Sequence, residues 1–311
     1  MKSENGYLEV IKMLPPFESL LKLVPSGIRT KATEIRIRAG NPIVIESATE
    51  RYICGTRRAD MNEIYACIKS FCDYSIHSCQ KELSEGWITL KGGHRAGFTG
   101  TAFVKNNKIE TIKDISSINL RIAHEHIGIS DFLFSKIINK PNLLGLIIAG
   151  PPLSGKTTFL RDFCRNLGTH YKTSLIDERG EIAAVYKGVP QNNVGMNTDV
   201  LNYFSKDCGF EQAIRVLSPE FIVCDEISGD LGAFQKCTAS GVKPIISIHC
   251  GNIEEALLNN TLISLFEMGT VNYVAFLGNG KEIGKLKGLW CINDRKNLAL
   301  CNNDNNLLFN W

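Results

Sequence analysis

The sequence predicts an α/β domain with a mostly parallel sheet, preceded by a smaller α+β domain. From Ile127 onward, short apolar segments alternate with helical or long connecting segments, and parallel strands need such connections to cross over a sheet. Before residue 120, strand and helix patterns follow one another without this alternation. A chain of 311 residues also exceeds what one small core accommodates. We therefore expect two domains, residues 1–125 and residues 126–311.

The first domain is expected to combine short helices with hairpin strands. Residues 34–38 alternate apolar and polar side chains and stop at Gly40-Asn41-Pro42, which is typical of a half-buried strand followed by a turn. Asp60-Met61-Asn62-Glu63 has the spacing of a capping box, and apolar residues then recur at helical intervals. We also expect a helix over residues 18–24 and a strand over 87–90 that enters a glycine-rich turn.

The second domain contains four apolar segments of strand length. Helical or long connections separate them, which favours βαβ crossovers and a largely parallel sheet. A pair of later segments is expected to close the sheet as a hairpin. The four segments are residues 146–149, 174–177, 221–225 and 244–248, and the hairpin comprises residues 273–277 and 286–292.

The composition is that of a soluble globular protein, because 44% of the residues are hydrophobic and 22% are charged. A net charge of +3, without any run of five like charges, gives no reason to expect a nucleic-acid partner. Eleven cysteines without a CxxC pair, and a start without a signal-peptide pattern, favour reduced thiols in the cytoplasm. Cys72, His77 and Cys79 lack a second ligand pair, so thiols are favoured over a zinc site. No apolar run reaches 18 residues, and we expect no membrane span.

The strongest motif is a phosphate-binding loop that follows the strand at residues 146–149. In the pattern G-x-x-x-x-G-K-[ST], the glycines let backbone N–H groups point at phosphate oxygens, the lysine reaches the β and γ phosphates, and the hydroxyl binds Mg²⁺. The alternative is a Gly/Pro turn that happens to carry Lys-Thr, but a buried strand before it and an amphipathic helix after it favour the loop. The expected nucleotide-binding residues are Gly150, Pro151, Pro152, Leu153, Ser154, Gly155, Lys156, Thr157 and Thr158.

Two adjacent acids end the strand at residues 221–225. Asp225 lies 69 residues after Lys156, at the place where a carboxylate could hold Mg²⁺ together with Thr157. Glu226 is expected to orient the attacking water. The alternative is a buried strand with two solvated acids at its carboxyl end. The presence of the phosphate loop in the same chain favours the functional role over this alternative.

Two further strand ends carry polar residues that could reach the same ligand. His249 follows the strand at 244–248, and the carboxyl ends of parallel strands line one crevice, so a γ-phosphate sensor is expected there. The alternative is a packed or surface histidine. Asp177-Glu178-Arg179-Gly180-Glu181 follows another strand, and Glu178 is the candidate for a base or for a ligand of metal-bound water. The alternative there is a structural cluster of ion pairs.

Several stretches together resemble the stage III sporulation protein AA family and, at a distance, the ATPases of type II and type IV secretion systems. The resemblance runs from about residue 30 to about residue 295. It departs from the family at Cys224, where an aliphatic residue is expected, and at Arg179-Gly180, where Arg-Ser is commoner. The stretches that carry it are the phosphate loop and residues 34–40, 92–97, 118–123, 177–182, 189–200, 214–220, 225–226 and 247–249.

The resemblance implies a RecA-like ATPase core that uses ATP and Mg²⁺. It also implies a ring, with six subunits expected, at the cytoplasmic face of a channel between mother cell and forespore. Its partners would be membrane proteins of the same sporulation complex, which would keep the chain peripheral at the mother-cell membrane. An acidic box would correspond to Asp177, Glu178 and Glu181, and a histidine box to His249. Arginines that act on a neighbour's nucleotide could be Arg36, Arg38, Arg95, Arg121 or Arg215, each with a local ion-pair role as the alternative.

Three functions remain in competition. The first is ATP hydrolysis that powers or assembles a channel, and the intact Asp225, Glu226 and His249 favour it. The second is an ATP-gated ring scaffold with little turnover. The third is a nucleic-acid motor, which would need a basic stripe or stacking aromatics that the sequence does not show. The apolar residues 307–311 are expected to dock on their own domain rather than on a partner.

Overall fold

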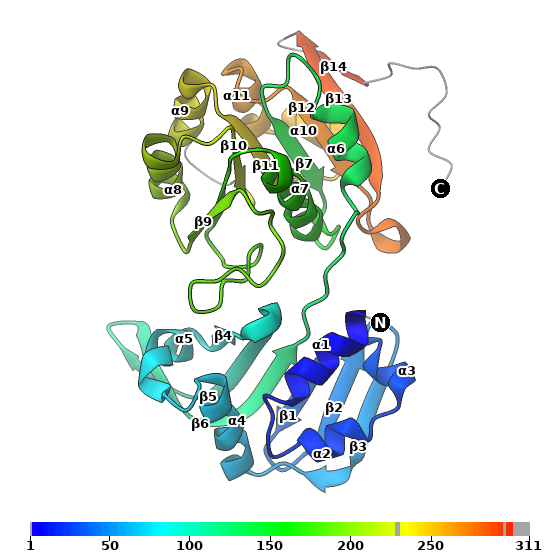
Figure 1. Ribbon diagram of the computed structural model, residues 1–311, viewed down its shortest axis with the longest axis vertical. Helices are drawn as coiled ribbons and strands as arrows, with labels where there is room; N and C mark the ends of the chain where they lie inside the picture. The colour runs from blue at the N-terminus through cyan, green and yellow to red at the C-terminus, as the bar shows by residue number, and fades with distance from the viewer. Residues whose placement is uncertain (1, 228–230, 295–296, 301–311) are drawn as a thin grey trace. The chain divides into compact units, whose positions relative to one another are not determined.

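The computed structural model describes residues 2–227, 231–294 and 297–300 (Figure 1). Residues 307–311, which are expected to dock on their own domain, lie outside the described residues. Contacts between Cα atoms divide this chain into two units. The first unit comprises Met1–His124 together with a later segment, Ala184–Gln191, and the second unit comprises the rest of the described chain. Among the described residues, none of the helices combines the length and the apolar character that crossing a bilayer requires.

The first unit is built on a six-stranded antiparallel sheet covered by short helices. The strand order is β3-β2-β1-β6-β5-β4. The strands are β1 (Ala32–Arg38), β2 (Pro42–Ser47), β3 (Arg51–Arg58), β4 (Trp87–Thr89), β5 (Arg95–Lys105) and β6 (Lys108–Arg121). The helices are α1 (Lys2–Ile11), α2 (Glu18–Lys22), α3 (Ser26–Arg29), α4 (Met61–Phe71) and α5 (Gln80–Glu85), with 3-10 turns η1 (Ile76–Cys79) and η2 (Lys91–Gly93).

The local sequence signals of this unit are confirmed. Ile35 and Ile37 of β1 are fully buried, while Arg36 between them pairs with Glu34 at 3.0 Å, as the alternation predicts. Asp60 caps α4 through the full capping box with Glu63. The helix expected over residues 18–24 ends earlier, at Lys22.

The segment Ala184–Gln191 is joined to this unit by three polar contacts. The Tyr186 hydroxyl donates to Asp73 at 2.6 Å, and the Lys187 ammonium lies 2.5 Å from the same carboxylate. The contact with Lys187, followed by that with Tyr186, lowers the pKa of Asp73. The N–H of Gly92 donates to the Gln191 side-chain oxygen at 2.9 Å. These contacts lie among residues that are more than 90 positions apart in the sequence.

The second unit is a mostly parallel sheet of eight strands in the order β14-β13-β12-β7-β11-β10-β8-β9. The pairs from β12 to β9 are parallel, and β13 and β14 are added antiparallel at one edge. The strands are β7 (Leu146–Gly150), β8 (Thr173–Asp177), β9 (Thr198–Asn202), β10 (Phe221–Cys224), β11 (Lys243–His249), β12 (Tyr273–Leu277), β13 (Leu286–Asp294) and β14 (Asn297–Leu300). The four predicted strands and the closing hairpin are confirmed, whereas β9 and β14 were not predicted.

Helices cover both faces of this sheet. The buried side chains of α8, α9 and α11 share one core with alternate residues of the central strands, and the rings of Phe210 and Phe234 meet there at 4.7 Å. Helix α7 packs across β7, β8, β10 and β11. The helices are α6 (Asp131–Ile137), α7 (Lys156–His170), α8 (Lys206–Gln212), α9 (Gly232–Ser240), α10 (Ile253–Leu258) and α11 (Asn260–Glu267), with a π-helical turn η3 (Ala213–Leu217) and a 3-10 turn η4 (Gly280–Glu282).

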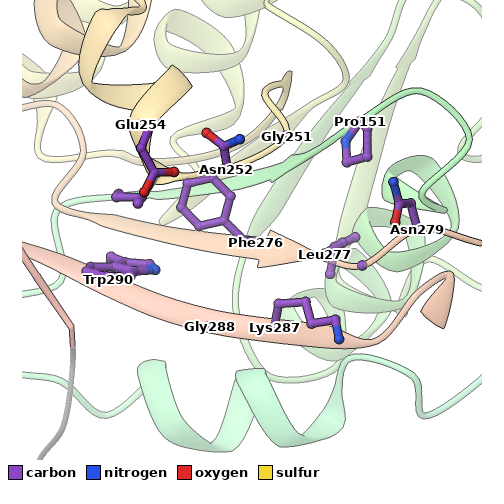
Figure 2. A pocket seen from close by; sticks show the side chains of 12 residues that line it. Pro151, Gly251, Asn252, Glu254, Phe276, Leu277, Asn279, Lys287, Gly288 and Trp290 are labelled. Atoms are coloured by element: carbon purple, nitrogen blue, oxygen red, sulfur yellow. The ribbon is translucent and has the colours of Figure 1, made fainter.

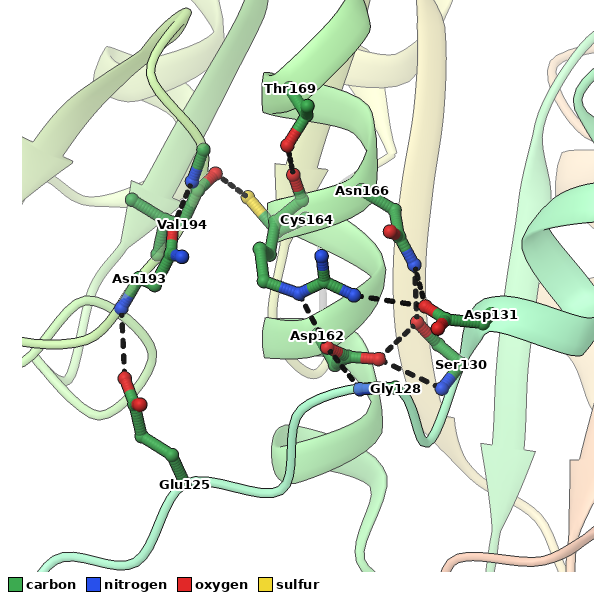
Figure 3. A network of polar contacts seen from close by, with 12 residues as sticks. Glu125, Gly128, Ser130, Asp131, Asp162, Cys164, Asn166, Thr169, Asn193 and Val194 are labelled. Carbon is green, nitrogen blue, oxygen red and sulfur yellow. Dashed lines mark hydrogen bonds and ion pairs between the residues drawn. The ribbon is translucent and has the colours of Figure 1, made fainter. Parts of the chain in front are cut away.

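A buried carboxylate fastens the beginning of the second unit to α7 (Figure 3). Asp162 accepts hydrogen bonds from the N–H groups of Gly128 and Ser130, at 3.0 and 2.9 Å, and from the Ser130 hydroxyl at 2.7 Å. Arg165 donates to it at 2.7 Å. Burial alone would raise the pKa of Asp162, but these donors outweigh burial and the net pKa is lowered. These hydrogen bonds therefore fix the segment before α6 to α7, the helix that follows the phosphate loop.

Replacing this carboxylate is expected to destabilise the second unit. Asp162→Ala leaves three donors from Gly128 and Ser130 without an acceptor, which should cost about 2–4 kcal/mol in the free energy of unfolding. Asp131→Ala is the control, because that side chain is 62% exposed and its loss should cost less than ~1 kcal/mol. Denaturant titration of the full chain measures the free energy of unfolding of both variants. Equal decreases in the two variants would contradict the stabilising role assigned to Asp162.

His94 gives the first unit a pH dependence. Its ring is 1% exposed, and its Nδ1 accepts the N–H of Ala123 at 3.0 Å. Burial, helped by the charge of His124, lowers its pKa from 6.5 to about 4. Glu9 lies 3.7 Å from Nε2, but that carboxylate is 58% exposed and does not offset burial.

Acid is therefore expected to destabilise the fold through His94. The unfolded histidine takes up a proton near pH 6.5 and the folded one only near pH 4, so the contribution is complete above pH 6.5 and is lost as the pH falls toward 4. The expected loss is at most ~3 kcal/mol. Denaturant titrations at several pH values give the free energy of unfolding as a function of pH. Between pH 4 and 6.5 this free energy should change less with pH in His94→Gln than in the wild type, and an equal change in both would contradict the role of His94.

Candidate functional site

The phosphate loop predicted at residues 150–157 connects the end of β7 to the start of α7. Its glycines are required by geometry: φ at Gly155 is +86°, and a Cβ atom at Gly150 would come within 2.4 Å of the Ser154 hydroxyl oxygen. The hairpin between β12 and β13 supports the loop from one side, because the N–H of Gly284 donates to the Ser154 carbonyl at 2.9 Å. The loop is thus a fixed, curled backbone at the N-terminus of a helix, which is suited to an anion.

The ammonium group of Lys156 is turned onto this loop. It donates to the carbonyl oxygens of Gly150 and Pro151, at 2.8 and 2.9 Å, and to Nδ1 of His249 at 3.0 Å. The residue is 7% exposed, and burial lowers the pKa of Lys156, although the carboxylates of Glu226 and Asp225 act in the opposite direction. A cation in this position can exchange its carbonyl partners for phosphate oxygens.

Asp225 follows β10 and joins three elements. Its Oδ2 accepts the hydroxyl of Thr157 at 3.1 Å, and its Oδ1 accepts the hydroxyl of Ser247 at 2.6 Å. The N–H of Glu226 also donates to Oδ1, at 2.9 Å. Ser247 and His249 are two residues apart on β11, so both face the same side of the strand.

The oxygen atoms of Thr157 and Asp225 fit Mg²⁺. Magnesium prefers hard oxygen ligands and is usually bound through one or two protein groups together with substrate phosphates. Among the described residues, no group of three or more His, Cys, Asp or Glu side chains could hold a metal by itself. A hydroxyl and a carboxylate at 3.1 Å, beside a phosphate loop, therefore match the kind of site that shares its metal with a nucleotide.

Glu226 is held between a histidine and an arginine. Its Oε1 lies 3.1 Å from Nε2 of His249, and its Oε2 lies 3.5 Å from Arg179. Because Lys156 can only donate to Nδ1 of His249, the hydrogen of the neutral ring is on Nε2 and is donated to Glu226. Lys156, His249 and Glu226 consequently form one continuous chain of hydrogen bonds.

The acidic residues after β8 point in different directions. Asp177 is buried and accepts the N–H groups of Glu181, Ile182 and Ala183, at 3.0, 3.1 and 2.8 Å, so its carboxylate shapes the loop. Burial raises the pKa of Asp177 despite these donors. Glu178 turns toward Lys206, 3.5 Å away, and lines a small adjoining cavity.

The predicted residues converge on one cavity of about 250 Å³ at the carboxyl end of the parallel strands. Its lining contains Lys156, Thr157, Asp225, Glu226 and His249, but not Glu178. Of the predicted loop residues, Leu153, Ser154, Gly155 and Thr158 also line it, whereas Pro151 lines a different cavity (Figure 2) and Gly150 and Pro152 line neither.

Three lining residues were not predicted as site residues on their own. Arg179 was noted only as a member of the acidic segment, Glu181 only as part of the acidic box that the resemblance implies, and Ser247 was not considered. The alternation of β11 could have identified Ser247, because it lies two residues before His249. The arginine in this lining is Arg179, which was not among the candidate arginines.

Three of those candidate arginines have local partners in the first unit. Arg36 lies 3.0 Å from Glu34, and Arg95 lies 3.8 Å over the ring of Trp87. Arg121 also pairs with Glu34, at 3.3 Å. A local structural role is thus present for these three side chains.

Solved structures of similar fold include an ATPase and a pilus retraction motor. The ATPase DotB of Legionella pneumophila aligns with a TM-score of 0.53 and 17% identity, over 85% of this chain and 74% of that chain. The pilus retraction motor PilT with bound ADP aligns with a TM-score of 0.55 and 15% identity, over 85% of this chain and 77% of that chain. At these identities the likeness concerns the fold, which is an α/β RecA-like core with a separate antiparallel sheet.

The sequence comparisons identify a narrower group. The family described as "Sporulation stage III, protein AA" matches residues 20–298. Stage III sporulation protein AA of Bacillus subtilis (strain 168) is 30% identical over 292 residues, which cover 91% of this chain and 94% of that protein. The phosphate loop, the acids after β10 and His249 all lie inside the matched region. The chain therefore belongs to the stage III sporulation protein AA family.

Proposed function

We propose that this protein is a Mg²⁺-dependent ATPase that converts ATP and water to ADP and phosphate. The supporting observation is the convergence of Lys156, the Thr157–Asp225 pair and the Glu226–His249 pair on one cavity. Each pair joins residues that are far apart in sequence, and each matches one requirement of phosphoryl transfer. The fold shared with secretion ATPases is consistent with this reaction.

Each side chain then has a defined task. The backbone of residues 150–157 holds the β and γ phosphates, and Lys156 binds their oxygens. Thr157 and Asp225 hold Mg²⁺, which neutralises charge on the phosphate oxygens. Glu226 orients the water that attacks, and Arg179 supplies a cation at the same cavity.

The hydrogen-bond chain suggests how binding activates Glu226. When Lys156 turns toward a phosphate, His249 loses its donor on Nδ1 and is free to reorient. Glu226 is then released from His249 and can accept a hydrogen bond from water. In this scheme His249 acts as the γ-phosphate sensor.

We further propose that the ATPase works as a homo-oligomeric ring, a hexamer by analogy with the secretion ATPases. It would power or assemble a channel complex of sporulation, bound to membrane proteins at the cytoplasmic face of the mother-cell membrane. Membership of the sporulation family supports the process, and the fold supports the motor. Residues 1–125 and 126–311 are proposed as its two functional domains, although residues 184–191 group with the first unit in space.

The reaction is tested by phosphate release with ATP and Mg²⁺ over a range of protein concentrations. Lys156→Ala removes the phosphate-binding cation and Glu226→Gln removes the carboxylate that orients water, so each should lower kcat at least ~100-fold. Glu226→Gln should still bind nucleotide. Glu211→Gln, an exposed acid on α8, is the matched control and should keep wild-type activity.

The outcomes separate the candidate functions. A specific activity that rises with protein concentration would support a ring with shared sites. Tight nucleotide binding without phosphate release at any concentration would contradict the enzyme and favour the ATP-gated scaffold.

Arg179 provides a second test, because it lines the cavity and touches Glu226. Its side chain is 66% exposed, so Arg179→Ala should leave the thermal midpoint unchanged while kcat falls by about 10- to 100-fold. Arg51→Ala, an exposed arginine on β3 with one acidic partner, is the control and should change neither quantity. Unchanged turnover of Arg179→Ala would remove this residue from the mechanism.

A further inference from the structure

The backbone carbonyl of Glu226 is bound by a lysine that does not line the nucleotide cavity. Lys206 is the first residue of α8, and its ammonium group donates a hydrogen bond to the carbonyl oxygen of Glu226. The same ammonium lies 3.5 Å from Oε2 of Glu178, and the Lys206 side chain is only 20% exposed. All three residues line the small cavity that shares Glu226 with the larger one. The lysine therefore joins two acidic residues that the sequence places far apart.

The order of the strands explains how this lysine reaches Glu226. Strand β8 lies between β10 and β9. Glu226 follows β10, Glu178 follows β8, and Lys206 comes after β9. The N–H of Tyr203 donates to the carbonyl oxygen of Asp177 at 2.9 Å, which ties the connection between β9 and α8 to the end of β8. The Lys206 side chain consequently reaches across the carboxyl end of β8 to the residue after β10.

Helix α8 itself does not favour a lysine at this position. The N-terminal end of a helix carries a partial positive charge, so a cation in the first turn is repelled and an acid is preferred. Lys206 occupies that first position, and its charge is offset by the Glu226 carbonyl and the Glu178 carboxylate. These two contacts, rather than the stability of α8, give the lysine its role.

Both peptide groups that flank Glu226 are held by hydrogen bonds. On one side, the N–H of Glu226 donates to Oδ1 of Asp225 at 2.9 Å and to the Ser247 hydroxyl at 3.0 Å. On the other side, its carbonyl accepts from Lys206, and the N–H of Ile227 donates to the Ser247 carbonyl at 3.1 Å. Because peptide groups are planar, fixing both of them fixes the direction in which the Glu226 side chain leaves the backbone.

We propose that Lys206 is a positioning residue for Glu226, the group that orients water in the ATPase reaction proposed above, on which this role rests. Glu178 acts through Lys206, by holding its ammonium group, and not on the nucleotide. This accounts for the place of Glu178, which the sequence favoured as a base but which does not line the nucleotide cavity. A shift of Glu226 by ~1 Å can slow the reaction about 100-fold, whereas the phosphate loop would still bind the nucleotide.

Phosphate release with ATP and Mg²⁺ tests the role of Lys206. Lys206→Met keeps the apolar stem and removes the donor, so kcat should fall about 10- to 100-fold while KM changes less than ~2-fold. Lys206→Arg keeps a donor and should recover kcat to within about 5-fold of the wild type. Lys236→Met is the control, because Lys236 is an exposed lysine on α9 with an acidic partner at 3.3 Å.

The proposal is overturned if Lys206→Met keeps the wild-type kcat, or if Lys206→Arg is as slow as Lys206→Met. Circular dichroism checks that each variant folds. If Lys206→Met does not fold, the shorter Lys206→Gln replaces it, with the same expected fall in kcat.

A double-mutant cycle tests whether Glu178 acts through Lys206. Glu178→Gln removes one charge from a half-exposed ion pair, so kcat should fall only about two- to fivefold. In Lys206→Met, the further change Glu178→Gln should alter kcat less than ~2-fold, because the carboxylate has lost its partner. If Glu178 were the base, Glu178→Gln alone would lower kcat at least ~100-fold, and this result would contradict the proposal.

Hydrogen–deuterium exchange without nucleotide separates the role of Lys206 from the reaction itself. The amide hydrogens of Glu226 and Ile227 should exchange at least about tenfold faster in Lys206→Met than in Lys236→Met. Faster exchange, combined with a wild type that releases no phosphate, would contradict the ATPase and still support the positioning of Glu226. Unchanged exchange at these two amides would overturn the positioning role whatever the rate of phosphate release.

Discussion

The site depends on one constraint, the position of β7 between β11 and β12 in a run of parallel strands. Parallel neighbours bring their carboxyl ends to the same edge, so whatever follows each strand must meet there. The loop after β7, the acids after β10 and the polar end of β11 are all positioned in this way. Because each strand interior is buried, changes in the core would move several site residues together.

A buried cation imposes the second level of order. The Lys156 ammonium needs acceptors, and it finds two carbonyls of its own loop and a ring nitrogen of His249. Satisfying this charge fixes the tautomer of His249, and the tautomer in turn determines what Glu226 accepts. The polar groups of the cavity are thereby arranged by hydrogen bonding rather than by packing.

The sequence was sufficient to predict those features that depend only on the order of strands and motifs along the chain. Four strands, the hairpin and the meeting of Lys156, Asp225 and His249 could be predicted, since strand ends converge by topology alone. The acidic segment could not be resolved, because the directions of Glu178 and Glu181 depend on Asp177 binding three later N–H groups. Nor could the grouping of residues 184–191 with the first unit be foreseen, because it rests on contacts to Asp73 and Gly92.

That grouping has a consequence for how this protein can be divided. The chain enters the first unit twice, once at its beginning and again between β8 and β9. A fragment made by cutting after His124 would keep Tyr186 and Lys187 but lose the carboxylate of Asp73 that both of them bind. The two units are compact in space, yet no single cleavage point in the sequence separates them.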